Sequence, residues 1–357
     1  MRLGRPRRPL RALAALVIVA TISALVRGVW VNGLFSTVKP GFSGTCRVVA
    51  DVSGVQDMEA AGESLFLSVG SGRGPGPRDG IYAMPLSGGA PVKLTGAPKD
   101  FHPRGIGLYR VPGTETLLLF AVNHRASGRF SIDSFEVKDA DVKDMGSHPA
   151  LAAQGTIEGG LLINPQDVAV AGPDLFYVAN GTAGKNPLIH GLQTYGIIPG
   201  GNVLYFNGTF FRQVADGLYG TRSLVLTPKG DHLIVGGLLS RSLTSFSRET
   251  FTGALTEADT LTLPAGPEKL GIDSFGQMWV AGHANLLDWR AMTGDPGKRA
   301  SSQLFRVRLM NGVPQAVEQV YGNSGTELAG ASVGLPAANR LLIGSSLDNR
   351  LLDCTPK

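Results

Sequence analysis

Apolar positions along most of this chain fall into short runs separated by turn-forming residues. Six such runs recur about 45–65 residues apart, and a second run follows each of them. The first runs are 63–70, 115–124, 173–181, 230–237, 276–283 and 339–346. Short runs rich in β-branched and aromatic residues and bounded by Gly, Pro, Asn and Asp predict strands. Six matched strand pairs predict an all-β six-bladed β-propeller. A β-sandwich is the structural alternative, but it does not explain the six matched pairs.

A further short segment precedes each run and is expected to form the innermost strand of its blade. These segments are 55–61, 103–109, 165–171, 221–227, 268–274 and 330–336. Each begins with polar residues, and we expect these to converge near the axis of the propeller. They are Gln56, Asp57, Arg104, Gln166, Asp167, Arg222, Glu268, Lys269 and Ser332. Buried charges must be paired or must hold a ligand, so this group is the candidate site.

The first 35 residues have a different pattern. Five arginines precede residues 12–26, a run of fifteen residues without a charge. A basic start followed by an apolar run is typical of an export signal. Cleavage after Ala24 would make it a signal peptide, whereas the apolar residues of 29–35 would extend it to a retained anchor. We expect the anchor, with residues 36–357 forming the propeller outside the cytoplasm.

The net charge of +5 comes from this basic start. Residues 1–50 hold eight basic residues and no acidic one, so 25 basic and 28 acidic residues remain for 51–357. The body of the protein is therefore mildly acidic. It has no basic stripe to neutralise phosphates, which argues against a nucleic-acid partner.

Two cysteines, Cys46 and Cys354, lie near the beginning and the end of the predicted propeller. In an oxidising compartment such a pair forms a disulfide more readily than it stays as two thiols. A bond between the first and last strands would suit a ring-shaped fold, whose weak point is its closure.

Several stretches together resemble the paraoxonases, the arylesterase and lactonase family of six-bladed propellers. The stretches are "GTCRVV…VQDMEA", "FHPRGIG…FAVNH", "NPQDVAVAGPDLFYVAN", "GQMWVAGH" and "LAGASVG…NRLLIGSSLDNRLLDC". They cover residues 44–354 in the family's order and spacing, and the terminal disulfide and an uncleaved apolar N-terminus belong to the same pattern. A looser relation to gluconolactonases and strictosidine synthases is expected. The resemblance implies a small-molecule ester or lactone as substrate.

The resemblance also implies two calcium ions in the channel. At the positions matching the ligands of the upper, catalytic ion, this chain has Gln56, Gln166, Arg222, Glu268 and Lys269. Calcium requires six to eight oxygen ligands, and Arg222 and Lys269 would bring positive charge instead. At about 4 Å each would repel the ion by several kcal/mol even at an effective dielectric constant near 20. We therefore expect the catalytic calcium to be absent.

The lower, structural ion is a different case. Its family ligands match Asp57, Asp167 and the backbone of Ile106, which are all present. A structural calcium is one expectation for these residues. The alternative is that the two aspartates pair with Arg104 or Lys269.

Arg104 stands where the family has the histidine proposed as general base. Arginine stays protonated and cannot accept that proton. The second family histidine matches His124, and His102 lies two residues before Arg104 as a substitute base. His124 and His283 both end apolar strands, where a hydrogen-bonded structural role is the common one. Residues 185–201 match the family's lid-like helical segment over the channel mouth, with a surface loop as the alternative.

Two function classes remain open. The first is a divergent ester or lactone hydrolase in which Arg104, Arg222 and Lys269 bind a carboxylate or an oxyanion. His124 or Glu268 would then be the proton acceptor, and Gln56, Gln166 and Ser332 would contact the substrate. The second is a non-catalytic propeller that binds an anionic small molecule or a protein partner. Fold alone does not separate these classes.

Overall fold

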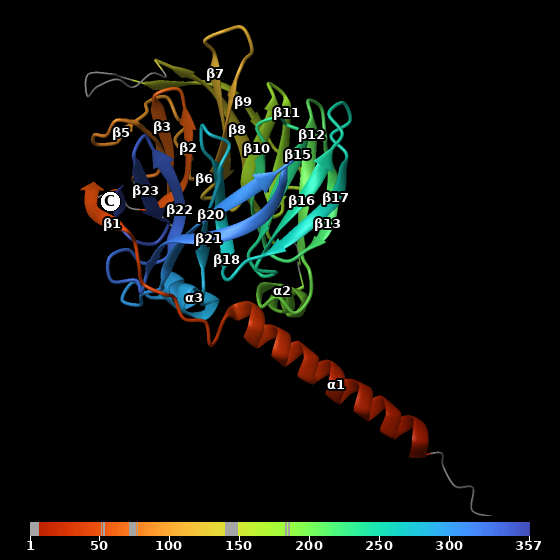
Figure 1. Ribbon diagram of the computed structural model, residues 1–357. Helices are drawn as coiled ribbons and strands as arrows, with labels where there is room; N and C mark the ends of the chain where they lie inside the picture. Colours follow the sequence, from red (N-terminus) through yellow and green to blue (C-terminus); the bar gives the residue numbers. More distant parts are fainter. Residues whose placement is uncertain are drawn as a thin grey trace, which may run out of the picture.

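The computed structural model is a six-bladed β-propeller with a helix projecting from one end (Figure 1). It describes residues 7–50, 52, 54–70, 76, 78–139, 149–182, 184 and 186–357. Every blade is a four-stranded antiparallel sheet. The predicted fold class is confirmed.

The first three blades each use four consecutive strands. Blade one holds β2 (Val55–Ala61), β3 (Ser64–Val69), β4 (Gly80–Pro85) and β5 (Val92–Lys93). Blade two holds β6 (Pro103–Arg110), β7 (Leu117–His124), β8 (Phe130–Lys138) and β9 (Ala150–Ile157). Blade three holds β10 (Pro165–Gly172), β11 (Leu175–Asn180), β12 (Gly201–Asn207) and β13 (Phe211–Leu218). The strand that begins each blade is the innermost one, as the sequence predicts.

The remaining blades complete the ring. Blade four holds β14 (Thr221–Leu226), β15 (His232–Gly237), β16 (Ser242–Arg248) and β17 (Leu255–Thr262). Blade five holds β18 (Gly266–Ile272), β19 (Met278–His283), β20 (Ser302–Met310) and β21 (Val313–Asn323). Blade six holds β22 (Ala331–Ala337), β23 (Arg340–Ser345) and β24 (Leu351–Pro356), with β1 (Gly44–Ala50) as its outer strand. The first strand of the chain therefore closes the last blade.

A disulfide fastens this closure, because Cys46 and Cys354 lie directly opposite each other in β1 and β24. The predicted pairing is thereby confirmed. Apolar side chains fill the spaces between neighbouring blades. Between blades two and three, for example, the rings of Phe120 and Phe176 are 5.4 Å apart, and both are almost completely buried. Period-2 alternation supplies these contacts, because successive side chains of a strand point to opposite faces of its blade.

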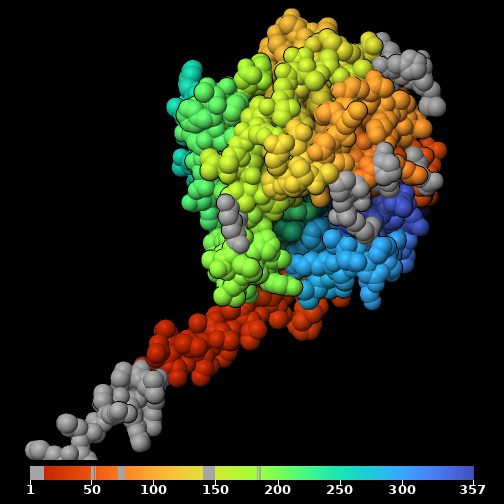
Figure 2. Space-filling model, turned by 180° about the vertical axis from the view of Figure 1, so that it is seen from behind, coloured from red at the N-terminus to blue at the C-terminus, as the bar shows by residue number. Residues whose placement is uncertain are grey.

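Three helices gather at one end of the ring: α1 (Arg7–Asn32), α2 (Pro187–Thr194) and α3 (Leu286–Gly294) (Figure 1). Within α1, residues Ala12–Asn32 are long and apolar enough to cross a membrane. Among the described side chains of α1, those that contact the propeller lie in the last part of the helix. There Arg27 Nε donates to the Gly196 carbonyl oxygen at 2.7 Å and the guanidinium lies over the Tyr219 ring, while Val31 is fully buried. Figure 2, which views the molecule from behind, shows α1 projecting from the same end of the ring.

Candidate functional site

Each innermost strand carries a β-bulge at its beginning. The pairing register shifts between Val55 and Asp57, Pro103 and Ile106, Pro165 and Asp167, Thr221 and Ser223, Pro267 and Lys269, and Ala331 and Val333. The residues left out of the pairing are Gln56, Gln166, Arg222, Glu268, Ser332 and, in blade two, Arg104 with Gly105. A bulge bends its strand and re-aims a side chain. Six bulges at the same level of the ring therefore bring the predicted polar residues together at one end of the channel.

Lys269 lies at the centre of the deeper part of this cluster. Its ammonium is 2.9 Å from Asp167 Oδ1, 3.4 Å from Asp57 Oδ2 and 3.0 Å from the Gln166 carbonyl oxygen. Lys269 and both aspartates are buried. Burial raises the pKa of Asp57 to about 7, against the opposing charge of Lys269. Of the alternatives for the two aspartates, the structure shows pairing with Lys269.

The shallower part of the cluster is built on Arg222. Its guanidinium donates to both carboxylate oxygens of Glu268, with Nε 3.1 Å from each, and Nη1 donates to Gln166 Oε1 at 2.7 Å. Burial by itself would raise the pKa of Glu268. The charge of Arg222 and the neighbouring His283 outweigh this effect and hold the pKa of Glu268 below its usual range. Glu268 is therefore an ionised partner of Arg222 and a poor proton acceptor.

Arg104 has a different environment from Arg222. Its Nη1 donates to Gln56 Oε1 at 3.2 Å, and among the residues that the structure describes no carboxylate forms an ion pair with it. Burial, together with the charge of Arg222, lowers the pKa of Arg104 to about 10, so its guanidinium stays charged at neutral pH. Arg104 is thus a partly buried cation that still has donors to offer a ligand.

His124 is a neutral neighbour of Arg104. Burial first, and then the charge of Arg104, lowers its pKa to about 4. Nε2 lies 2.6 Å from the Pro165 carbonyl oxygen, so Nε2 carries the proton and Nδ1 keeps the lone pair. His124 therefore has a fixed tautomer and an accepting nitrogen.

Three sequence candidates do not have the substrate-facing or base role that the sequence suggested for them. Lys269, expected among the substrate contacts, has its ammonium turned toward the aspartates. Ser332 is 1% exposed and donates to the carbonyl oxygens of Val55 and Gly344, so it joins blades six and one. The imidazole of His102 lies between two carboxylates, with Nδ1 2.7 Å from Asp79 Oδ2 and Nε2 3.2 Å from Asp100 Oδ1.

The residues present do not fit the two calcium ions that the resemblance implies. Lys269 fills the space between Asp57 and Asp167, and Ile106 contributes its N–H to Asp57 Oδ2 at 2.9 Å. Arg222 occupies the oxygens of Gln166 and Glu268 in the same way. Within the described ranges, no group of three or more His, Cys, Asp and Glu side chains could hold a metal.

Two residues of the site wall were not assigned to it from the sequence. Trp289 in α3 lies under the Arg222 guanidinium at 5.4 Å and stacks on His283 at 5.2 Å. His283 is 1% exposed, and its Nε2 is 3.7 Å from Glu268 Oε2. Asn285, which caps α3, follows two residues after His283 and is a sequence signal for this helix.

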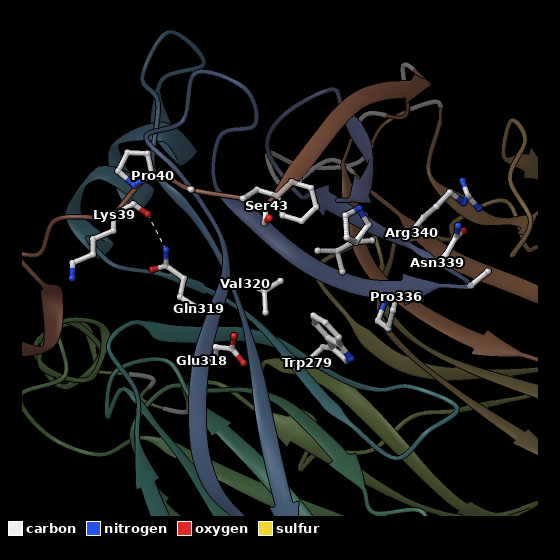
Figure 3. A pocket seen from close by; sticks show the side chains of 15 residues that line it. Lys39, Pro40, Ser43, Trp279, Glu318, Gln319, Val320, Pro336, Asn339 and Arg340 are labelled. Atoms are coloured by element: carbon white, nitrogen blue, oxygen red, sulfur yellow. Dashed lines mark hydrogen bonds between the residues drawn. The ribbon is translucent and has the colours of Figure 1, made fainter.

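A cavity lies away from this cluster. It is a groove of about 760 Å³ on the outside of the propeller, where the segment after α1 passes between β21 and the β22–β23 turn (Figure 3). Phe42, Trp279, Pro336 and Arg340 are among its lining residues. None of the predicted site residues lines this groove, so the channel cluster remains the candidate site.

Comparison with known proteins agrees with the sequence resemblance and with the fold. The family model described as Arylesterase matches residues 86–355. Human serum paraoxonase/arylesterase 2 is 28% identical over 71% of this chain and 69% of its own length. The rat paraoxonase/arylesterase 2 is 26% identical over 87% of this chain and 88% of its own length.

Solved structures with this fold are more distant in sequence. A luciferin-regenerating enzyme has a TM-score of 0.52 and 10% identity, covering 87% of this chain and 95% of that one. A gluconolactonase from Xanthomonas campestris has a TM-score of 0.50 and 16% identity, covering 88% and 90%. At these identities the likeness concerns the fold alone.

Proposed function

We propose that this chain, which belongs to the arylesterase family of the paraoxonases, is a calcium-independent hydrolase of small carboxylic esters or lactones. The proposal rests on the family membership together with the arginines of the channel. One observation carries the proposal. Arg104 is a charged, partly buried guanidinium without an ion-pair partner among the described residues. It is near enough to the neutral, oriented His124 for its charge to lower the pKa of that imidazole. Ester hydrolysis is accelerated by a donor that stabilises the oxyanion and by a proton acceptor that activates the attacking water.

The proposed chemistry uses the side chains alone. Free N–H groups of Arg104 would donate to the carbonyl oxygen and stabilise the oxyanion that forms. His124 Nδ1 would take a proton from a water molecule as the water oxygen attacks the carbonyl carbon. When the acyl C–O bond breaks, the same proton would pass to the leaving oxygen. Glu268 would hold Arg222 in place beside the substrate.

The first test is hydrolysis of aryl esters and lactones by the full chain, with and without a calcium chelator. We expect activity that the chelator leaves unchanged. Arg104→Gln should reduce kcat/KM by roughly 10²-fold, as loss of one oxyanion donor does in other hydrolases. Arg110→Gln is the matched control, because Arg110 is an exposed arginine at the far end of the same strand. Activity that disappears on chelation from a folded protein would contradict the proposal.

A non-catalytic binding role is the second candidate. It is favoured by the low pKa of His124, which makes this imidazole a weak base. In that case Arg104 and Arg222 would bind a small carboxylate. The expected result is no hydrolysis, but a rise in melting temperature with short carboxylic acids that Arg104→Gln abolishes.

We also propose that the propeller lies outside the cytoplasm and is held to a membrane by α1. The disulfide supports an oxidising compartment, and α1 is long and apolar enough to cross a bilayer. Resistance of the exported chain to extraction by alkaline carbonate would agree with a retained anchor. Recovery of a soluble form that begins after Ala24 would show a cleaved signal instead.

A further inference from the structure

The pair of buried aspartates at the channel axis is joined by an ammonium group that belongs to the chain itself. The three N–H bonds of Lys269 face three oxygens, those of Asp167, Asp57 and the Gln166 backbone, at 2.9, 3.4 and 3.0 Å. Lys269 is 5% exposed, and Asp57 and Asp167 are 3% and 2% exposed. At this depth an ammonium group is stable only when oxygens replace its lost hydration, as they do here.

The two carboxylates also accept hydrogen bonds from groups in neighbouring blades. Asp57, in blade one, accepts from the Ile106 N–H of blade two at 2.9 Å. Asp167, in blade three, accepts from the Leu224 N–H of blade four at 3.1 Å and from Ser223 Oγ at 2.5 Å. Since Lys269 comes from blade five, a single cluster of contacts connects five blades at the axis. Its centre is the ammonium nitrogen.

A metal ion has no room in this centre. Calcium lies 2.3–2.6 Å from its oxygen ligands, so an ion bound to the same three oxygens would overlap the ammonium nitrogen. The space beside it is also closed. A Cβ atom added to Gly105 would come within 2.0 Å of Asp167 Oδ1 and 2.6 Å of Lys269 Nζ. The cluster is filled and held together without a divalent cation.

We infer that the Lys269 ammonium takes the place of a metal ion in this fold. The propeller is therefore stable without divalent cations. It becomes a divalent-cation binder when Lys269 is replaced by a shorter side chain that carries an oxygen. Removal of the ammonium leaves two carboxylates and a backbone carbonyl around one vacated volume. These hard oxygen donors are the kind that calcium prefers, and an asparagine amide can add a further one. The inference concerns the fold and does not rest on the proposed hydrolase activity.

The test compares the melting temperature of the full chain and its Lys269 variants in millimolar calcium chloride and in chelator. For the native protein we expect the same melting temperature in both, and no calcium retained after dialysis. Lys269→Asn in chelator should melt roughly 5–10 °C lower, because two buried carboxylates lose their partner. Calcium should restore most of this loss, and calorimetric titration should show about one ion per chain.

Two further variants keep the test decisive. Lys269→Met fills the volume but brings neither charge nor oxygen, so it should be destabilised and calcium should not rescue it. Lys298→Asn changes an exposed lysine and should behave as the native protein does in both solutions. If Lys269→Asn does not fold in chelator, its folded yield with and without calcium replaces the melting curve. Calcium bound by the native chain, or a native melting temperature that falls in chelator, would overturn the inference.

Discussion

Arg222 and Glu268 form a bidentate ion pair in which the two partners differ in exposure. The Glu268 side chain is 5% exposed and that of Arg222 is 20% exposed. Arg222→Gln would leave a buried, unpaired carboxylate, so we expect a loss of about 3–5 kcal/mol in the free energy of unfolding. The double variant Arg222→Gln/Glu268→Gln should recover most of that loss, because it removes the charge that needs a partner.

Denaturant unfolding of the two single variants and the double variant gives the coupling energy of this pair. Arg306→Gln is a suitable control, because Arg306 pairs with Glu318 on the exposed surface, where such a pair contributes little. A loss below about 1 kcal/mol for Arg222→Gln would show that Glu268 finds another partner or takes up a proton.

The pKa of His124 determines the pH dependence of its contribution to stability. Burial lowers this pKa from 6.5 to about 4, so between these values the unfolded chain binds the proton more tightly than the folded one. The contribution is therefore fully present above pH 6.5 and is lost as the pH falls toward 4. His124→Gln removes the titrating group and keeps a donor for the Pro165 carbonyl oxygen.

Between pH 7 and pH 5, the native protein should lose about 2 kcal/mol more stability than His124→Gln. Chemical unfolding of both proteins at the two pH values measures this difference. Equal losses in the two proteins would mean that His124 titrates at its ordinary pKa in the folded state.

At the scale of single elements, the bulge in β6 depends on a glycine. A Cβ on Gly105 would lie 2.5 Å from the Asp167 Cα atom, which is backbone and cannot move aside easily. Gly105→Ala should therefore destabilise the protein by at least about 2 kcal/mol, through overpacking at the axis. Thermal unfolding is the measurement.

Gly155→Ala is the matched control for this prediction. Gly155 also lies in a strand, β9, and its nearest contact to an added Cβ is the Ser134 hydroxyl at 3.5 Å. This variant should stay within about 0.5 kcal/mol of the native protein. Equal effects of the two alanines would show that the beginning of β6 can move away from β10.

For the whole molecule, the ring is closed where β1 pairs with β24, and the disulfide links these two strands covalently. The disulfide spans 308 residues, and in the chain-entropy model such a link stabilises by up to about 5 kcal/mol. In Cys46→Ser/Cys354→Ser, we expect hydrogen exchange to accelerate mainly in β1 and its neighbour β24. The inner strands of blades two to four should remain protected, because their contacts do not involve the closing blade. Uniform acceleration in all blades would indicate that the ring opens as one unit.

The sequence alone was sufficient for the ring and for most of the polar residues of the cluster, but not for His283 and Trp289 in its wall. The six inner segments were recognisable because period-2 alternation and turn residues are local signals. The polar residues of the cluster were recognisable because they occur at the same position of each segment, before the apolar alternation begins. Cys46 and Cys354 could be paired because they lie at the two ends of the predicted propeller. The strand and turn signals depend on neighbours in the chain, and the cysteine pairing depends on the positions of the two cysteines along it; a single sequence records both.

The contacts within the cluster were decided by the tertiary structure. Glu268 and Lys269 are adjacent in the chain, yet one pairs with Arg222 and the other with Asp57 and Asp167. The physical reason is the bulge between Pro267 and Lys269, where the alternation of side-chain direction that sequence reasoning relies on breaks down. Which cation reaches which carboxylate then depends on the distances between five blades, and these exist only in the folded ring.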